Sequence, residues 1–132
     1  MSKLKAFLKG NYKELENTPL PLERFGEDVI LRPLFEESEA IQESCFQNKP
    51  GKKGKQERVF NNIKYNREIC VASIVHPDLN STELQDDLEV RGADKAYLKL
   101  FSLGERTQIL EKVTEINGLD EDTNDEIEEA KN

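Results

Sequence analysis

The chain has 132 residues, of which 36% are hydrophobic and 35% charged, and its formal net charge is −8. This length and composition predict one domain with a compact core and a heavily charged surface. The acidity disfavours nucleic-acid binding by the surface as a whole, and no apolar run reaches the roughly 18 residues of a membrane span. We therefore expect a protein of the cytoplasm.

Residues 1–18 form an N-terminal segment with a short apolar pattern. Leu4, Phe7 and Leu8 follow helical spacing and predict one or two turns of amphipathic helix, which Gly10 then interrupts. A helix this short is marginal alone. The segment is therefore expected either to dock on the core or to bind a partner.

Residues 19–34 predict a small β-hairpin. The strands are expected at 20–25 and 29–33, joined by a short loop that contains Gly26. A lone hairpin is barely stable in water, so we expect this one to pack on helices.

Residues 35–119 are expected to be helical, so the predicted fold class is α+β and mostly α, with the hairpin packed on a bundle of four to five helices. The apolar periodicity predicts helices over 36–46, 59–75, 81–90, 93–101 and 102–118. The second half of helix 59–75 is apolar nearly all round, so this helix is expected to be the central one. The side chains expected to be largely buried are Val71, Ile74, Leu84, Ile109, Leu110 and Val113.

The local signals for helix starts are strongest at two places. After Pro77, Asn80 is expected to be an N-cap that forms a capping box with Glu83, with Leu79 and Leu84 as the accompanying apolar pair. A second capping box is expected between Ser102 and Glu105, and Gly118 is expected to end that last helix. The corner at 79–84 is interpreted as structural rather than as a binding site.

Two segments carry opposite charge. Residues 48–58 have a net charge of +4 and are interpreted as a solvated, mobile loop, with a phosphate-binding patch as the alternative. Residues 120–132 have a net charge of −6 and are expected to form a solvated acidic tail outside the single domain 1–119. A short helix over 125–130 is an alternative there.

No catalytic, cofactor-binding or metal-ligating residues are predicted. Cys45 and Cys70 lie in apolar helical patterns and are expected to be buried thiols rather than a disulfide. His76 is the single histidine and is interpreted as structural, at a helix end next to Pro77. The sequence has no zinc-ligand spacing. An enzymatic function has no support in these residues.

Several motifs in order resemble one protein family. They are the corner PDLN-S-ELQD, the GA before the following helix, the turn L-x-GE, and LEKVTEING followed by an acidic end, together with the opening LKAFLKGN. With these motifs the chain resembles phage tail assembly chaperones of the XkdN-like type, from phages and prophages of Gram-positive bacteria.

The resemblance implies a non-enzymatic assembly factor of the host cytoplasm. Such a factor binds the tape measure protein, assists assembly of the tail tube and is absent from the mature virion. The tail-tube protein and a second copy of the chain are further candidate partners. A small-molecule substrate, a cofactor or a membrane is not expected. The alternatives are a nucleic-acid-binding regulator that uses residues 48–58, and a structural tail protein retained in the virion.

The candidate partner-binding residues are apolar and lie in two places. The N-terminal segment has too few apolar residues to fold unaided, and the stripe on the helix at 93–101 is wider than the roughly 100° that one core contact needs. The candidates are Leu4, Phe7, Leu8, Tyr97, Leu98 and Phe101. The alternative for Tyr97, Leu100 and Phe101 is a place in the core of the domain itself, and Leu98, which is offset from them, is the better candidate for a partner contact.

Overall fold

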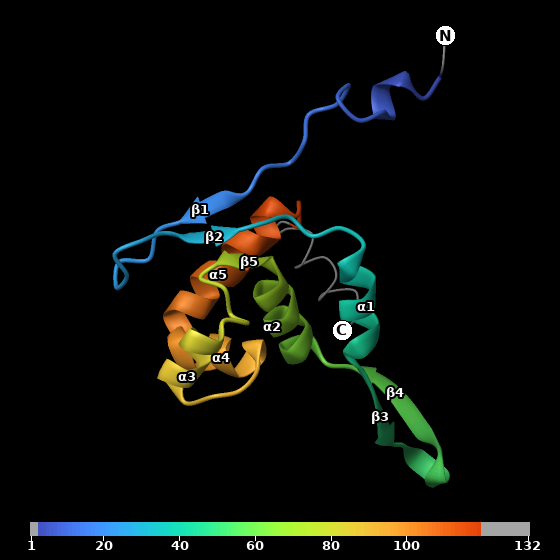
Figure 1. The fold of residues 1–132 in the computed structure, drawn as a ribbon. Helices are drawn as coiled ribbons and strands as arrows, with labels where there is room; N and C mark the ends of the chain where they lie inside the picture. Colours follow the sequence, from blue (N-terminus) through green and yellow to red (C-terminus); the bar gives the residue numbers. More distant parts are fainter. Residues whose placement is uncertain (1–2, 120–132) are drawn as a thin grey trace.

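A computed structural model of the chain describes residues 3–119. Helices and two small antiparallel sheets make up this part (Figure 1). The α-helices are α1 (Glu37–Ser44), α2 (Asn62–Ser73), α3 (Thr82–Leu88), α4 (Ala93–Leu100) and α5 (Leu103–Ile116). The predicted class, α+β and mostly helical, is confirmed. The predicted acidic tail at 120–132 lies outside the described residues.

The predicted N-terminal hairpin forms, but it is one part of a three-stranded sheet. The strands, in the spatial order β1-β2-β5, are β1 (Thr18–Leu20), β2 (Val29–Leu31) and β5 (Ile74–His76). The first strand was predicted at 20–25 and in fact ends at residue 20. Pro19 can be accommodated in β1 because this strand lies at the edge of the sheet, where an N–H is not needed on the open side.

Helix α2 is shorter at both ends than the predicted helix 59–75. It begins after Asn61, whose side chain accepts a hydrogen bond from the Lys64 N–H at 3.0 Å. It ends at residue 73, because β-branched residues 74 and 75 favour extended backbone and Pro77 disfavours helical backbone at residue 76. Residues 74–76 pair with β2 instead. The central position is as expected, since α2 contacts α1, α4 and α5.

The core lies between the three-stranded sheet and helices α2, α4 and α5. Of the side chains predicted to be buried, Ile74, Ile109 and Val113 are buried, whereas Val71, Leu84 and Leu110 are partly buried and pack against this cluster. The buried hydrophobic cluster consists of Leu22, Val29, Leu31, Ile69, Cys70, Ile74, Leu79, Ala96, Tyr97, Phe101, Ile109 and Val113.

The N-cap of helix α3 lies one residue later than predicted. Helix α3 is capped by Ser81, whose hydroxyl accepts a hydrogen bond from the Leu84 N–H at 3.3 Å. The Asn80 N–H donates instead to the Asp78 carboxylate at 3.0 Å, so a turn precedes the cap. Asn80 is therefore not the N-cap, and the predicted capping box with Glu83 does not form.

The predicted capping box at the start of α5 is confirmed. The Ser102 hydroxyl accepts from the Glu105 N–H at 3.2 Å, and the Glu105 carboxylate accepts from the Ser102 N–H at 2.8 Å. Two donors that the helix itself cannot satisfy are thereby paired.

The segment predicted as a basic loop is a folded two-stranded ribbon, and this part of the prediction is wrong. Strand β3 (Phe46–Pro50) pairs with β4 (Gln56–Phe60) in a regular antiparallel register. The short 3₁₀ turn η2 (Lys52–Gly54) joins them. The ribbon projects away from the helices, on the side of the molecule opposite to the N-terminal segment (Figure 1). We call residues 46–60 the basic arm.

Candidate protein-binding surfaces

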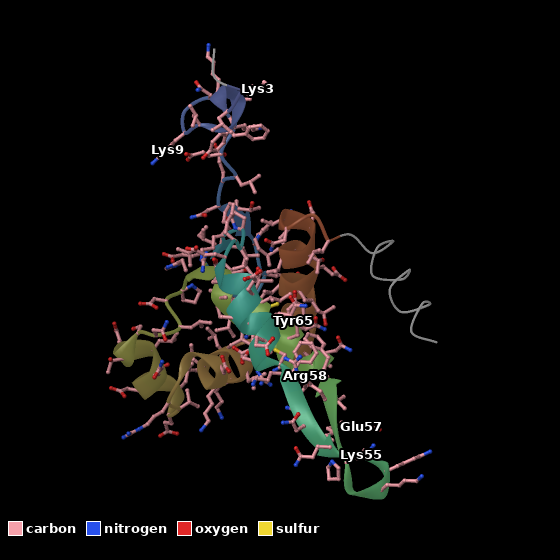
Figure 2. All side chains as sticks on the ribbon, turned by 90° about the vertical axis from the view of Figure 1, so that its right-hand side faces the viewer. Lys3, Lys9, Lys55, Glu57, Arg58 and Tyr65 are labelled. Atoms are coloured by element: carbon pink, nitrogen blue, oxygen red, sulfur yellow. The ribbon has the colours of Figure 1, made fainter. Side chains whose placement is uncertain are left out.

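The N-terminal segment does not dock on the core. Every residue from 3 to 17 is exposed, and the segment extends away from the helices (Figures 1 and 2). The predicted amphipathic helix is reduced to one 3₁₀ turn, η1 (Lys5–Phe7). The exposed fractions are 63% for Leu4, 77% for Phe7 and 49% for Leu8. Of the two alternatives, docking is therefore not observed, and these side chains are accessible to a partner.

Two further apolar side chains extend this exposed surface, and the sequence reasoning missed them. Tyr12 is 48% exposed and Leu15 is 63% exposed. With Leu4 and Leu8 they follow a helical spacing of four, four and three residues, which was the available signal. Gly10, at a φ of +94°, interrupts the pattern in this conformation. We call residues 3–17, with these side chains, the N-terminal apolar segment.

Helix α4 presents one of its three candidate residues to solvent. Tyr97 and Phe101 are 3% and 2% exposed, and their rings pack 5.7 Å apart, so both belong to the core. Burial raises the pKa of the neighbouring Cys70 thiol to about 11. Leu98 is 44% exposed. The structure therefore brings Tyr97 and Phe101 together inside and leaves Leu98 on the surface.

Other exposed apolar side chains lie outside the predicted set. Phe35, Ile63 and Leu103 are 63%, 80% and 74% exposed. Phe35 lies in the connection before α1, Ile63 lies in α2 and Leu103 lies in α5. Single exposed apolar residues are common on protein surfaces, and a contiguous group is more informative. The N-terminal apolar segment is such a group, because its five large apolar side chains occupy one short stretch of chain.

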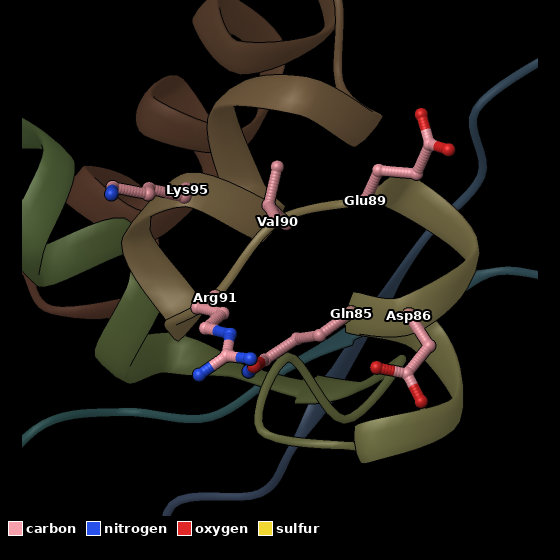
Figure 3. A pocket seen from close by; sticks show the side chains of 6 residues that line it. All are labelled: Gln85, Asp86, Glu89, Val90, Arg91 and Lys95. Carbon is pink, nitrogen blue, oxygen red and sulfur yellow. The ribbon is translucent and has the colours of Figure 1, made fainter.

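The shallow groove between α3 and α4 has a structural role. Its lining residues are Gln85, Asp86, Glu89, Val90, Arg91 and Lys95. The Gln85 amide donates to the Leu79 carbonyl at 2.8 Å and accepts from the Gly92 N–H at 3.0 Å, so it holds the connection between the two helices. The charged side chains point in different directions rather than towards a common point (Figure 3). The groove is therefore not a preorganised ligand site.

The basic arm is anchored at its base and charged at its tip. The Phe46 and Phe60 rings pack 5.0 Å apart, the Arg58 guanidinium stacks over the Phe46 ring at 3.9 Å, and Arg58 also pairs with Glu43. The tip carries Lys52, Lys53 and Lys55, all exposed. Figure 2 shows Lys55 and Glu57 at the outer end of the ribbon.

Neither a metal-ligand cluster nor a disulfide is present among residues 3–119. Cys45 and Cys70 are both buried free thiols, as predicted. His76 lies in β5 rather than at a helix end, and its Nε2 is 2.9 Å from the Glu27 carboxylate in an exposed position. Within the same residues, no helix combines the length and hydrophobicity needed to cross a bilayer.

The fold and its surfaces define a small α+β protein with two exposed extensions, one apolar and one basic. The chain belongs to the phage XkdN-like tail assembly chaperone family, whose model matches residues 4–131. The crystal structure of the protein yqbn shares the fold, with a TM-score of 0.71 and 19% sequence identity over 91% of this chain and 99% of that chain. Comparison with curated proteins finds no match.

Proposed function

We propose that this protein is a non-enzymatic chaperone that binds the tape measure protein through the N-terminal apolar segment and thereby assists assembly of the tail tube. The observation that carries the proposal is the exposure of five large apolar side chains within residues 4–15. An apolar stretch whose side chains are exposed to solvent favours a protein partner. Membership of a tail assembly chaperone family makes a tail protein the expected partner.

The energetics of this segment suit reversible binding. Burial of a large apolar side chain contributes about 1.5–3 kcal/mol. Ordering the backbone on binding costs about 1–2 kcal/mol per residue, which over residues 4–15 is at least as large as that gain. A chaperone must release its client, and a segment that orders itself on binding gives modest affinity for a large contact area.

The helical spacing of the apolar residues indicates how the segment binds. An amphipathic helix that lays its apolar side on a partner uses positions four, four and three residues apart, as in Leu4, Leu8, Tyr12 and Leu15. The segment would then be helical only in the complex. An apolar face on the long tape measure protein is a matching surface. A second copy of this chain is the alternative occupant.

Leu98 on α4 is proposed as a second, weaker contact. In Figure 1, α4 and the N-terminal segment lie on different sides of the molecule, so the two contacts would act on separate stretches of the partner. Leu98 is exposed, and its replacement leaves the buried Tyr97 and Phe101 in place.

Co-expression tests the proposal in cells. The protein should increase the soluble yield of the tape measure protein, and Leu98→Asp should reduce that increase without unfolding the chaperone. Ile63→Asp is the matched control, because Ile63 is an even more exposed apolar side chain on a different helix. Equal soluble yield with and without the chaperone would contradict the proposal.

The basic arm supports a second candidate function, nucleic-acid binding, because its tip presents three exposed lysines. The net charge of −8 for the whole chain counts against it. A strongly salt-dependent shift with duplex DNA or RNA would favour this candidate. Retention in the virion as a structural tail protein is the other alternative, and mass spectrometry of purified particles separates it from a chaperone that is lost on assembly.

A further inference from the structure

The turn at the tip of the basic arm has a well-defined geometry. The Gly51 N–H donates to the Lys55 carbonyl at 2.6 Å, and a Cβ on Gly51 would lie 2.7 Å from both that oxygen and the Glu57 side chain. Lys53 and Gly54 both have positive φ, at 60° and 73°. The tip is therefore a turn of defined backbone geometry, and the lysines project from neighbouring positions along it.

The lysines at the tip have no acidic partner in the described chain. Among residues 3–119, no carboxylate lies within ion-pair distance of Lys52, Lys53 or Lys55. The nearby Arg58 is already paired with Glu43. Three like charges within four residues repel one another, so an acidic ligand at the tip would be stabilised by all three.

The most acidic stretch of the chain is residues 120–132. It carries −6 of the total formal charge of −8. The remaining 119 residues are therefore close to neutral, and the chain contains one strongly acidic segment together with one compact basic tip.

The acidic segment begins at a distance from the tip that its length can span. The Leu34 N–H donates to the Asn117 side chain at 2.8 Å, so the end of α5 lies beside the residues that lead into α1. From there, α1 covers about 12 Å and β3 about 17 Å, which puts the tip roughly 30–40 Å from the end of α5. A chain of thirteen residues spans up to roughly 45 Å when extended.

We infer that the tip of the basic arm is a binding site for the acidic segment 120–132 of the same chain. Lys52, Lys53 and Lys55 would contact carboxylates of this segment in an electrostatic complex that is sensitive to salt. The site is separate from the N-terminal apolar segment, so the inference goes beyond the proposed function and does not depend on it. It also gives a reason why a basic arm on an acidic protein would not collect nucleic acid.

The N-terminal segment contains the main competing cations. Its lysines at positions 3, 5, 9 and 13 are spread over eleven residues with only one 3₁₀ turn among them. The tip lysines are clustered on a fixed turn, so less conformational freedom is lost when they bind. This difference favours binding of the acidic segment to the tip of the basic arm. The N-terminal lysines serve as the matched control.

A spin label on the full-length chain tests the inference. Cys45 and Cys70 are 0% and 1% exposed, so a nitroxide can be attached selectively to an added thiol in Asn132→Cys, at the end of the segment that can reach the tip. In the ¹⁵N-labelled chain, the amide signals of residues 52–55 should lose more than half of their intensity. Salt at about 0.5 M should restore them, because it screens the contact.

Charge reversal at the tip and, as a control, in the N-terminal segment shows which lysines bind the acidic segment. Lys52→Glu with Lys55→Glu should abolish the broadening at the tip, whereas Lys3→Glu with Lys9→Glu should leave it unchanged. Broadening that survives the first pair, or that falls on residues 3–13 instead, would overturn the inference. So would broadening seen only when spin-labelled chains are mixed with separate ¹⁵N-labelled chains, which assigns the contact to a second copy. Displacement by an equal concentration of duplex DNA would assign the tip to nucleic acid instead.

Discussion

Arg24 and Glu105, 81 residues apart, form a two-point ion pair in which Nε and Nη2 donate to the two carboxylate oxygens at 3.0 and 2.6 Å. The same guanidinium donates to the Leu100 carbonyl at 2.6 Å. Glu105 also completes the capping box with Ser102. One carboxylate therefore joins the loop after β1 to the start of α5.

The Glu105 carboxylate predicts a loss of stability in acid. Hydrogen bonds from Arg24 lower the pKa of Glu105 to about 2, against 4.5 for an ordinary glutamate. A group whose folded pKa is depressed contributes stability above its unfolded pKa, and that contribution is lost as pH falls from about 4.5 to about 2. Urea unfolding at several pH values should show this slope, and Glu105→Gln should reduce it. An equal slope in the variant would show that other groups cause the acid sensitivity.

Glu68 predicts the opposite dependence at higher pH. Burial raises the pKa of Glu68 to about 7, and the neighbouring Asp94 acts in the same direction. The folded state then binds a proton that the unfolded state has released, so stability should fall as pH rises from about 4.5 to 7. Glu68→Gln should be more stable than the native protein at pH 8 and lack this decline. A variant that is destabilised equally at pH 5 and pH 8 would contradict the assignment.

The corrected helix cap can be tested with adjacent substitutions. Ser81→Ala should lower the free energy of unfolding by about 0.5–2 kcal/mol, because the Leu84 N–H loses its acceptor. Asn80→Ala should cost less than about 0.5 kcal/mol, since only its backbone N–H is engaged by Asp78. The reverse order of these two costs in urea unfolding would place the cap at Asn80.

Because the α2–β5 segment is central, a cavity made at Ile74 should lower the free energy of unfolding substantially. Ile74 is 8% exposed and belongs to the core cluster, so Ile74→Ala should cost about 2–5 kcal/mol. Ile63→Ala, at a side chain that is 80% exposed, is the control and should cost far less. A measured loss below about 1 kcal/mol for Ile74→Ala would mean that this side chain is not enclosed.

Elements specified by local chemistry were predictable from the sequence. The box of Ser102 and Glu105 needs only two residues at a fixed spacing, and it forms as predicted. The helices and the buried Ile109 and Val113 followed from apolar periodicity. The cap at Ser81 was misplaced by one residue because Asn80 and Ser81 are both good capping residues, and the turn at Asp78 decides between them.

Elements that depend on pairing between distant residues were not predictable. The sequence of the basic arm predicts a loop, because its residues are mostly polar and its glycines and lysines are typical of loops. The Phe46 and Phe60 rings at its base are 14 positions apart in the sequence and become neighbours only when the strands pair. Likewise, residues 74–76 join the sheet because β2 is present beside them.

Some candidate partner-binding residues are buried and others are exposed, and this difference also depends on contacts between distant parts of the chain. A helical stripe shows which residues share a side of a helix but not what covers that side. Tyr97 and Phe101 are covered by the core, whereas Leu98 is exposed. The N-terminal segment could be identified as unable to fold alone, and its exposure in the structure agrees with that expectation.

The central claim is that the N-terminal apolar segment binds the tape measure protein, and calorimetric titration of the two purified proteins tests it most directly. Phe7→Asp with Leu8→Asp should weaken binding at least tenfold, about 1.4 kcal/mol. The thermal unfolding temperature should be unchanged, because neither side chain is in the core. Moderate salt should have little effect on the native affinity. Undiminished affinity in this double variant would contradict the account. So would a loss of binding in Ile63→Asp or in moderate salt, because the contact would then lie elsewhere or be electrostatic.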